Sequence, residues 1–385
     1  MTHVNEKRDV SRNFGLDVCR TAAILLVVSG HTLQHSNPHP ILAKLGMCGL
    51  FGVDLFFCLS GFLIGRILLA EAKHWPVGHE AGLFGFWYRR WMRTLPLYFV
   101  NFIVSLRYDW RGATRLVDQL PYLLFCQNLA WKMPDFFRLS WSLAVEEWFY
   151  LTFPLVLLVF CALGKSARRA ALLAIAVFIS VPFLFRIFLP AHLTDMPIFD
   201  EGLRNIVVFR LDSIGFGVLI AYLYMWKKDW FATLAKCWPL FAILVAACIA
   251  YTKSGYVGLA DSPALAPFYF LISSFAFAML IPKFNSLKPT RFSLLNSFVT
   301  YTSKISYSLY LGHIFGFMIA MDCLRKFGLF DAVYPNPWIT YPLFWATGYV
   351  LASATYLTIE RPILKLRDKR SHGAFHPVEA DAGAP

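Results

Sequence analysis

Charged residues are scarce in this sequence, and their scarcity excludes most soluble folds. Asp, Glu, Lys and Arg make up 15% of the 385 residues, whereas hydrophobic residues make up 58%. A soluble protein of this length would have roughly a quarter charged residues. The composition therefore predicts an integral membrane protein.

The sequence also lacks a secretory cleavage pattern and paired cysteine motifs. The apolar stretch from Phe14 is soon followed by a second apolar stretch, so we interpret it as a retained first helix and not as a signal peptide. None of the eight cysteines forms a CxxC motif or lies near a histidine at metal-ligand spacing. A disulfide framework and a metal site are therefore not expected.

Long apolar stretches predict an all-α, polytopic protein with about ten transmembrane helices. About twenty apolar residues in a row are typical of a spanning helix. The stretch 120–131 is short and is interpreted as a span, a buried segment or a re-entrant segment. The ten candidate spans lie at 14–33, 46–69, 95–107, 141–161, 170–189, 205–226, 236–252, 266–282, 301–321 and 340–360.

Basic residues orient these spans. The net charge of +13 could indicate a nucleic-acid ligand, but positive loops beside membrane spans explain it better, so no nucleic acid is expected. With ten spans, the groups richest in Lys and Arg lie on the cytoplasmic side, and both termini are cytoplasmic. The basic residues that fit this orientation poorly are Arg107, Arg111, Arg115, Lys132 and Arg138.

One membrane domain is expected, with a short tail at each end. Residues 1–13 are predicted to form a cytoplasmic N-terminal tail, and residues 14–367 the membrane domain. Residues 368–385 are polar and are predicted to form a disordered cytoplasmic tail. No internal repeat and no separate soluble domain are visible.

Three ionisable residues are expected at one depth near the outer surface. Asp54 is the single charged residue in 51–64, and placing a carboxylate in a membrane helix costs about 2.5–3.5 kcal/mol on insertion scales. His31 lies near the outer end of the first predicted helix, and Glu146 lies in the outer half of the fourth. A carboxylate beside a histidine is how proteins build a general base. We therefore predict that His31 is the base and that Asp54 or Glu146 orients it.

Arginines at the cytoplasmic ends of the helices indicate an anion site. Arg20 lies eleven residues before His31, about three helical turns, so both side chains should lie on the same helix face. Arg90 and Arg93 lie one turn apart where the third span begins. Guanidinium groups suit phosphates, although a positive-inside anchor for Arg90 and Arg93 and a snorkelling Arg20 remain alternative interpretations.

Seven motifs in order resemble the acyltransferase-3 family of bacterial integral-membrane acyltransferases, and they cover the chain from about residue 14 to about 367. They are Arg20-x10-His31, GVDLFFCLSGFLI, RRWMR followed by Pro96, WSLAVEEWFY, RLDSIGFGVLIA, ISYSLYLGH and ERPILKL.

The resemblance implies a multi-pass enzyme of the bacterial inner membrane. It implies transfer of an acyl group, usually acetyl, from cytoplasmic acyl-CoA to a hydroxyl of a carbohydrate or glycolipid at the outer face. Acyl-CoA would be a co-substrate, with no permanently bound cofactor. By position, His31 is the catalytic histidine, Arg20 its paired arginine, and Arg90 and Arg93 the donor-binding pair. Asp54 and Glu146 match further signature positions of the family.

Six further residues are candidates for acceptor contacts or pore lining. Arg210 and Asp212 form either an intramembrane structural pair or acceptor contacts, and His313 is either a satisfied buried histidine or a functional one. Ser142 and Tyr150 are either oxyanion donors or ordinary packing hydrogen bonds. The six candidates are Trp141, Ser142, Tyr150, Arg210, Asp212 and His313.

Several alternatives stay open at this point. The acceptor could be a lipopolysaccharide, an exopolysaccharide, a glucan or a small molecule, and the acyl group could be succinyl. An acyl-histidine intermediate and any oligomeric state are also compatible with the sequence. A proton-coupled transporter is a weaker alternative because no inverted repeat or matched pair of broken helices is visible.

Overall fold

The computed structural model describes six stretches of the chain, and they are helical. No strand occurs among them, so the all-α prediction is confirmed. The predicted tails lie mostly outside these stretches. The described residues are 12–35, 47–75, 79–109, 116–188, 202–254 and 266–371.

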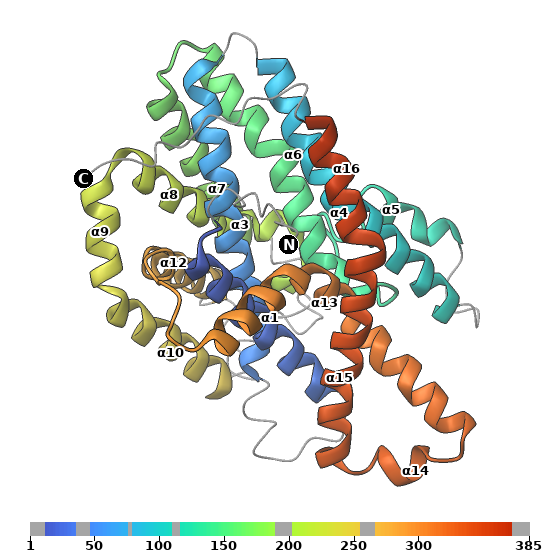
Figure 1. Cartoon of the computed structure of the whole chain (residues 1–385). Helices are drawn as coiled ribbons and strands as arrows, with labels where there is room; N and C mark the ends of the chain where they lie inside the picture. The colour runs from blue at the N-terminus through green and yellow to red at the C-terminus, as the bar shows by residue number, and fades with distance from the viewer. Residues whose placement is uncertain are drawn as a thin grey trace, which may run out of the picture.

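Twelve longer helices make up most of the described structure (Figure 1). The first six are α1 Phe14–His35, α3 Leu50–Glu71, α4 His79–Asp109, α6 Trp141–Ala162, α7 Ala167–Phe188 and α8 Leu211–Trp226. The others are α9 Lys228–Lys236, α10 Trp238–Ser254, α12 Ala266–Asn285, α13 Ser293–Lys326, α15 Pro337–Thr355 and α16 Arg361–Ser371.

Short elements connect these helices. A π-helical turn at Tyr356–Glu360 joins α15 to α16. The stretch 120–131 contains the four-residue helix α5 Leu120–Leu123 and then turns, with a positive φ at Phe125. This stretch is therefore not a spanning helix. A second four-residue helix, α14 Phe330–Val333, lies between α13 and α15.

Six described helices are long and apolar enough to cross a membrane. Each of the ten predicted spans overlaps a described helix, but four of them do not reach this criterion alone. Helix α8 has only 16 residues, and α9 and α10 are bent by 62° and would together make a seventh span. The count of ten transmembrane helices and the cytoplasmic location of both termini stay predictions. The six candidate spans are Phe14–Leu33, Leu50–His74, Arg138–Ala162, Ala167–Phe188, Pro267–Asn285 and Ser293–Lys326.

Glycines let α3 approach two of its neighbours, α1 and α8, closely. A Cβ atom at Gly52 would lie 2.5 Å from the carbonyl oxygen of Ala23 in α1, and one at Gly61 would lie 2.0 Å from the carbonyl oxygen of Ile214 in α8. Larger residues would separate these backbones. Helix α3 is thereby held between α1 and α8, which places Asp54 near the start of α8.

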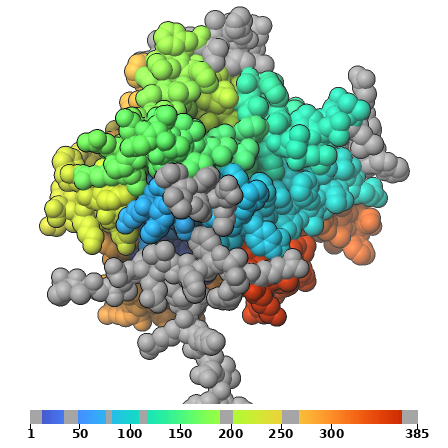
Figure 2. Space-filling view, turned by 90° about the horizontal axis from the view of Figure 1, so that it is seen from above, coloured from blue at the N-terminus to red at the C-terminus, as the bar shows by residue number. Residues whose placement is uncertain are grey.

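The C-terminal helices pack against earlier helices of the bundle. Helix α15 packs against α13, and α16 lies beside α4 (Figure 1). Seen from above, the teal and green segments around α5, α6 and α7 make up much of the visible face (Figure 2). Helices α1, α3, α4, α6 and α13 together surround the cavity described next.

Candidate active site

A partly open cavity lies between five helices. Its polar lining comes from widely separated parts of the sequence, and apolar side chains of α3 complete the wall. The polar lining residues are Arg20, Ser60, Arg90, Arg93, Thr94, Ser142, Glu146, Ser306, Tyr307 and Tyr310.

Arg20 is held in place by a cluster at the first turns of α1. Its Nη1 donates a hydrogen bond to Ser303 Oγ at 3.2 Å and lies 3.7 Å from Asp17 Oδ1. Ser303 Oγ in turn donates to Asp17 Oδ1 at 2.7 Å, and Arg12 Nε lies 2.5 Å from the other carboxylate oxygen of Asp17. One carboxylate thus faces two guanidinium groups, and Arg20 contributes positive charge to the cavity.

Arg90 and Arg93 line the cavity as a pair from α4. The Arg90 guanidinium lies 4.1 Å from the ring centre of Tyr150 and 3.9 Å from Glu146 Oε2. Its Nε is buried without a hydrogen-bond partner among the described residues. A buried donor without a partner costs free energy, so Arg90 is suited to receive an anionic ligand.

The adjacent acids Glu146 and Glu147 point in different directions. Glu146 lines the cavity and accepts hydrogen bonds from Ser60 Oγ at 3.0 Å and Tyr150 OH at 2.9 Å. Glu147 accepts a hydrogen bond from Thr94 Oγ1 at 2.9 Å. The sequence placed Glu146 level with His31, whereas the structure places it at the level of Arg90.

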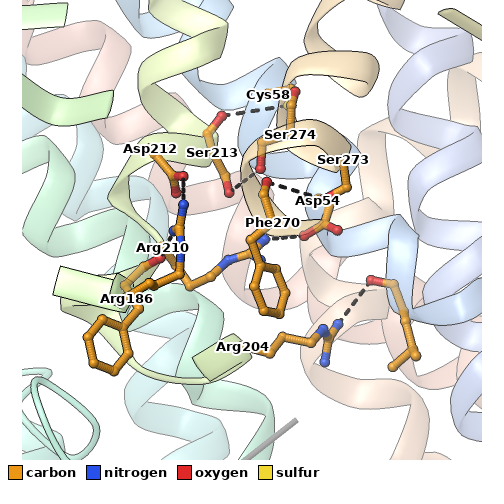
Figure 3. A network of polar contacts seen from close by, with 12 residues as sticks. Asp54, Cys58, Arg186, Arg204, Arg210, Asp212, Ser213, Phe270, Ser273 and Ser274 are labelled. Carbon is orange, nitrogen blue, oxygen red and sulfur yellow. Dashed lines mark hydrogen bonds and ion pairs between the residues drawn. The ribbon is translucent and has the colours of Figure 1, made fainter. Parts of the chain in front are cut away.

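Asp54 belongs to a buried network of arginines and acids (Figure 3). Its Oδ1 forms an ion pair with Arg210 Nη2, and the Arg210 guanidinium lies 4.4 Å from the ring centre of Phe270. Asp212 Oδ2 lies 2.6 Å from Arg186 Nη2. Arg210 and Asp212 are therefore not partners of one another, as one interpretation of the sequence had it, but members of two neighbouring pairs.

Sequence reasoning missed two arginines near this network. Arg186 is fully buried, and its Nη1 also donates to the carbonyl oxygen of Phe209. Arg204 lies 4.8 Å from the ring centre of Trp141, and its Nη2 donates to the carbonyl oxygen of Leu50 at 2.9 Å. Arg186 was detectable, because a cation near the end of an apolar span usually has a partner inside the protein.

His31 contacts a second histidine. His31 Nδ1 lies 2.9 Å from Nε2 of the fully buried His313. Asp54 and Glu146, which we expected to orient His31, are bound to Arg210 and to Ser60 and Tyr150 instead. The expected three-residue cluster is therefore replaced by separate polar contacts.

Ser142 and Tyr310 form a hydroxyl pair in the cavity wall. Tyr310 OH donates to the carbonyl oxygen of Leu139 at 3.0 Å, so the 2.6 Å contact with Ser142 Oγ requires the serine to donate. Trp141, one residue before Ser142, packs edge-on against Phe57. The candidate oxyanion donor Ser142 is thus already engaged by Tyr310.

Helix α13 connects the arginine end of the cavity to the histidine pair. Ser303 contacts Arg20, Tyr307 OH donates to the carbonyl oxygen of Thr94 at 2.6 Å, Tyr310 contacts Ser142, and His313 contacts His31. The ten residues from Ser303 to His313 span about 15 Å. Tyr310 lines the cavity and His313 follows one turn later, so the histidine pair lies just beyond the end of the cavity.

The described residues contain no group of three or more His, Cys, Asp or Glu side chains that could hold a metal ion. The polar groups of the cavity wall and of the histidine pair are guanidinium, hydroxyl, carboxylate and imidazole groups. Such a set can bind an anion and move a proton.

Comparison with known proteins is consistent with this arrangement. The chain is 28% identical over 169 residues to the peptidoglycan O-acetyltransferase OatA of Listeria monocytogenes, covering 40% of this chain and 25% of the relative. It is 27% identical over 331 residues to the O-acetyltransferase OatA of Staphylococcus aureus strain NCTC 8325, covering 78% of this chain and 49% of the relative. The chain thus spans at most about half the length of these relatives, and no solved structure matches it.

The family assignment rests on a match over most of the chain. Residues 13–357 match the family model of the acyltransferase-3 domain. This range includes the cavity, the arginines at one end of it and the histidine pair beyond the other end. The chain therefore belongs to the acyltransferase-3 family of acyltransferases.

Proposed function

We propose that the protein is a membrane O-acyltransferase that uses acyl-CoA as donor and a carbohydrate or glycolipid hydroxyl as acceptor. The donor enters from the cytoplasmic side, and the acceptor binds at the outer face of the inner membrane. Acetyl is the favoured acyl group because the two relatives carry the name O-acetyltransferase. Peptidoglycan, named as the substrate of the Listeria relative, makes a glycan the first acceptor to test.

The observation that carries this proposal is the polarity of the cavity. Arg20, Arg90 and Arg93 converge on it from two helices. The unpartnered Nε of Arg90 offers a donor to a phosphate oxygen of CoA. Apolar side chains of α3, including Val53 and Phe57, complete the wall along which a pantetheine arm would lie.

His31 supplies the base in the proposed reaction. It takes the proton of the acceptor hydroxyl while the oxygen attacks the thioester carbonyl carbon. A C–O bond forms, the C–S bond breaks, and the CoA sulfur leaves with the proton returned by His31. General acid–base catalysis of this kind contributes about 10²–10⁴-fold to the rate.

The two acids take other roles in this proposal. Glu146 holds Arg90 and Tyr150 at the donor end of the cavity through its contacts with both. Asp54 compensates the buried charge of Arg210.

We expect Arg90→Ala to weaken acyl-CoA binding by about 1.5–3 kcal/mol, the range for hydrogen bonds to charged groups. Arg90→Lys should restore only part of the affinity because an ammonium group lacks the bidentate guanidinium geometry. Calorimetry with acetyl-CoA and the detergent-purified protein measures both variants.

Arg325→Ala is the matched control, because Arg325 is an exposed arginine paired with Asp322 near the end of α13. It should bind acetyl-CoA like the wild type. If Arg90→Ala bound acetyl-CoA with unchanged affinity, Arg90 would not belong to the donor site and would instead act as a membrane anchor.

The transporter alternative can be tested with the same protein. An acyltransferase releases CoA thiol from acetyl-CoA when an acceptor is present. A proton-coupled transporter would instead accumulate solute in proteoliposomes that carry a pH gradient, without consuming acetyl-CoA.

A further inference from the structure

A buried carboxylate lies at the C-terminal end of a packed helix face. Helix α15 packs against α13, and its buried residues Thr340, Phe344, Gly348 and Ala352 recur every four positions. Residues four apart lie on one face of a helix. Glu360 follows at the same spacing, two steps after Ala352, and is 5% exposed. A carboxylate therefore occupies a position on a face that is otherwise uncharged.

The π-helical turn Tyr356–Glu360 keeps this side chain on the face toward α13. In an α-helix, each step of four residues advances about 40° around the axis. A π-helical turn contains more residues than an α-helical turn, so it compensates part of this advance. Glu360 Oε2 consequently accepts a hydrogen bond from Ser308 Oγ of α13 at 2.6 Å.

The same turn lies beside the arginine end of the cavity. It packs against α4, the helix that carries Arg93 into the cavity wall. Glu360 is the acid with the strongest electrostatic interaction with Arg93, and it interacts less strongly with Arg20. Among the described residues, its hydrogen bond goes to Ser308. The carboxylate therefore acts on the arginines through its charge and not through a direct contact.

This carboxylate completes the charge balance of the cavity. Arg20 lies 3.7 Å from Asp17, and a second acid, Glu146, lies 3.9 Å from Arg90. Arg93, the third arginine, has the carboxylate of the π-helical turn as its strongest acidic partner. A cation that is removed from water without a nearby counter-charge costs free energy. The turn thus supplies the counter-charge that Arg93 needs when no donor is bound.

We propose that Glu360 is the internal counter-anion of the donor site. Its carboxylate compensates the charge of Arg93 before the donor binds, and a phosphate group of acyl-CoA does so in the complex. Two anions then share the same arginines, so Glu360 weakens the binding of acyl-CoA. This inference rests on the proposed function, in which these arginines hold acyl-CoA.

The carboxylate has a consequence for the release of the product. CoA has the same phosphate groups as acyl-CoA, so arginines that bind the donor also retain the product. A fixed anion beside the arginines lowers the affinity for both molecules. Glu360 therefore allows CoA to leave after transfer, at the cost of a higher KM for the donor.

Glu360→Gln tests this role, because it removes the charge but keeps the size of the side chain and an acceptor for Ser308. We expect CoA and acetyl-CoA to bind about 3–10-fold more tightly, as for one unit charge at roughly 10 Å in a medium of intermediate dielectric constant. Calorimetry with the detergent-purified protein measures both affinities. A merely structural role would not increase them.

Thermal unfolding supplies the second readout. Without CoA, the melting temperature of Glu360→Gln should be lower than that of the wild type, because Arg93 has lost its counter-charge. Saturating CoA should then raise the melting temperature of Glu360→Gln by more than that of the wild type, because the tighter ligand stabilises the folded state more.

Two variants serve as controls. Glu360→Asp keeps the charge and should bind CoA with an affinity near that of the wild type. Asp229→Asn changes the net charge of the protein by the same amount as Glu360→Gln, but Asp229 is an exposed residue of α9. Its CoA affinity should also stay near that of the wild type, because water and salt screen exposed charges.

The proposal is overturned if Glu360→Gln binds CoA with wild-type or weaker affinity, or if Asp229→Asn binds CoA as tightly as Glu360→Gln. If Glu360→Gln does not fold, the double variant Glu360→Gln/Arg93→Gln decides the question. Removal of both charges should restore folding, and a double variant that is equally unfolded overturns the proposal. Failure of the proposed function gives a different result, because the wild type would then bind no acetyl-CoA.

Discussion

His31→Ala should lower the turnover number for acyl transfer by about 10²–10⁴-fold, the usual contribution of a general base. The affinity for acetyl-CoA should change little, because the three arginines of the cavity are intact in this variant. His31 contacts His313, one helical turn beyond the cavity-lining Tyr310. Turnover measured as CoA thiol release, together with calorimetry, separates the two effects.

Ser29→Ala is a suitable control on the same helix. Ser29 Oγ donates to the carbonyl oxygen of Leu25 within α1, so its loss should leave transfer near the wild-type rate. The melting temperature of His31→Ala should confirm that the bundle is folded. More than about a tenth of wild-type turnover in a folded His31→Ala protein would contradict the general-base role.

Asp54→Asn should destabilise the protein by about 3–5 kcal/mol, the usual cost of removing one partner of a buried ion pair. Arg210 is fully buried, and its Nε and Nη1 have no hydrogen-bond partner in the described part of the chain. Without the Asp54 carboxylate, its charge loses the ion pair that the structure shows. The melting temperature in detergent should fall clearly, whereas the acyl-CoA affinity of the folded fraction should be retained.

A double-mutant cycle makes this expectation specific. Combining Asp54→Asn with Arg210→Gln removes both charges, so the double variant should be more stable than the sum of the single effects predicts. Asp322→Asn is the control, because Asp322 forms an exposed pair with Arg325 that should contribute about 0–1 kcal/mol. If Asp54→Asn kept the wild-type melting temperature but lost turnover, Asp54 would instead have a role in catalysis.

The helices were predictable because a long apolar stretch inside a membrane must satisfy its own backbone hydrogen bonds, and an α-helix does so within one segment. The common orientation of Arg20 and His31 was also predictable, because eleven residues make about three turns. The structure confirms it, since Arg20 contacts Ser303 and His31 contacts His313, both in α13.

The partners of the acids were not predictable from depth alone. A charge pattern places a residue in one half of a membrane, but it does not say which helix lies opposite. Asp54 pairs with Arg210, 156 residues away, and Glu146 lies beside Arg90. The number of spans was not predictable for a similar reason, because short or charged helices such as α8 and α4 depend on their neighbours for burial.

The choice of His313 as the partner of His31 required side-chain geometry. Both residues were candidates in the sequence, but one was assigned to catalysis and the other to pore lining. The structure shows that they lie together, with 2.9 Å between Nδ1 of His31 and Nε2 of His313. The sequence therefore predicted a role for each residue separately, and the structure showed which residues contact one another.

The most direct test of the proposed function is the transfer of labelled acetyl from acetyl-CoA to a glycan by the purified protein. The protein would be reconstituted in liposomes with acetyl-labelled acetyl-CoA and peptidoglycan-derived oligosaccharides, and the glycan fraction analysed for ester-linked label. We expect label on glycan hydroxyls with the wild type and at least about 100-fold less with His31→Ala. Equal labelling by the two proteins would contradict the account.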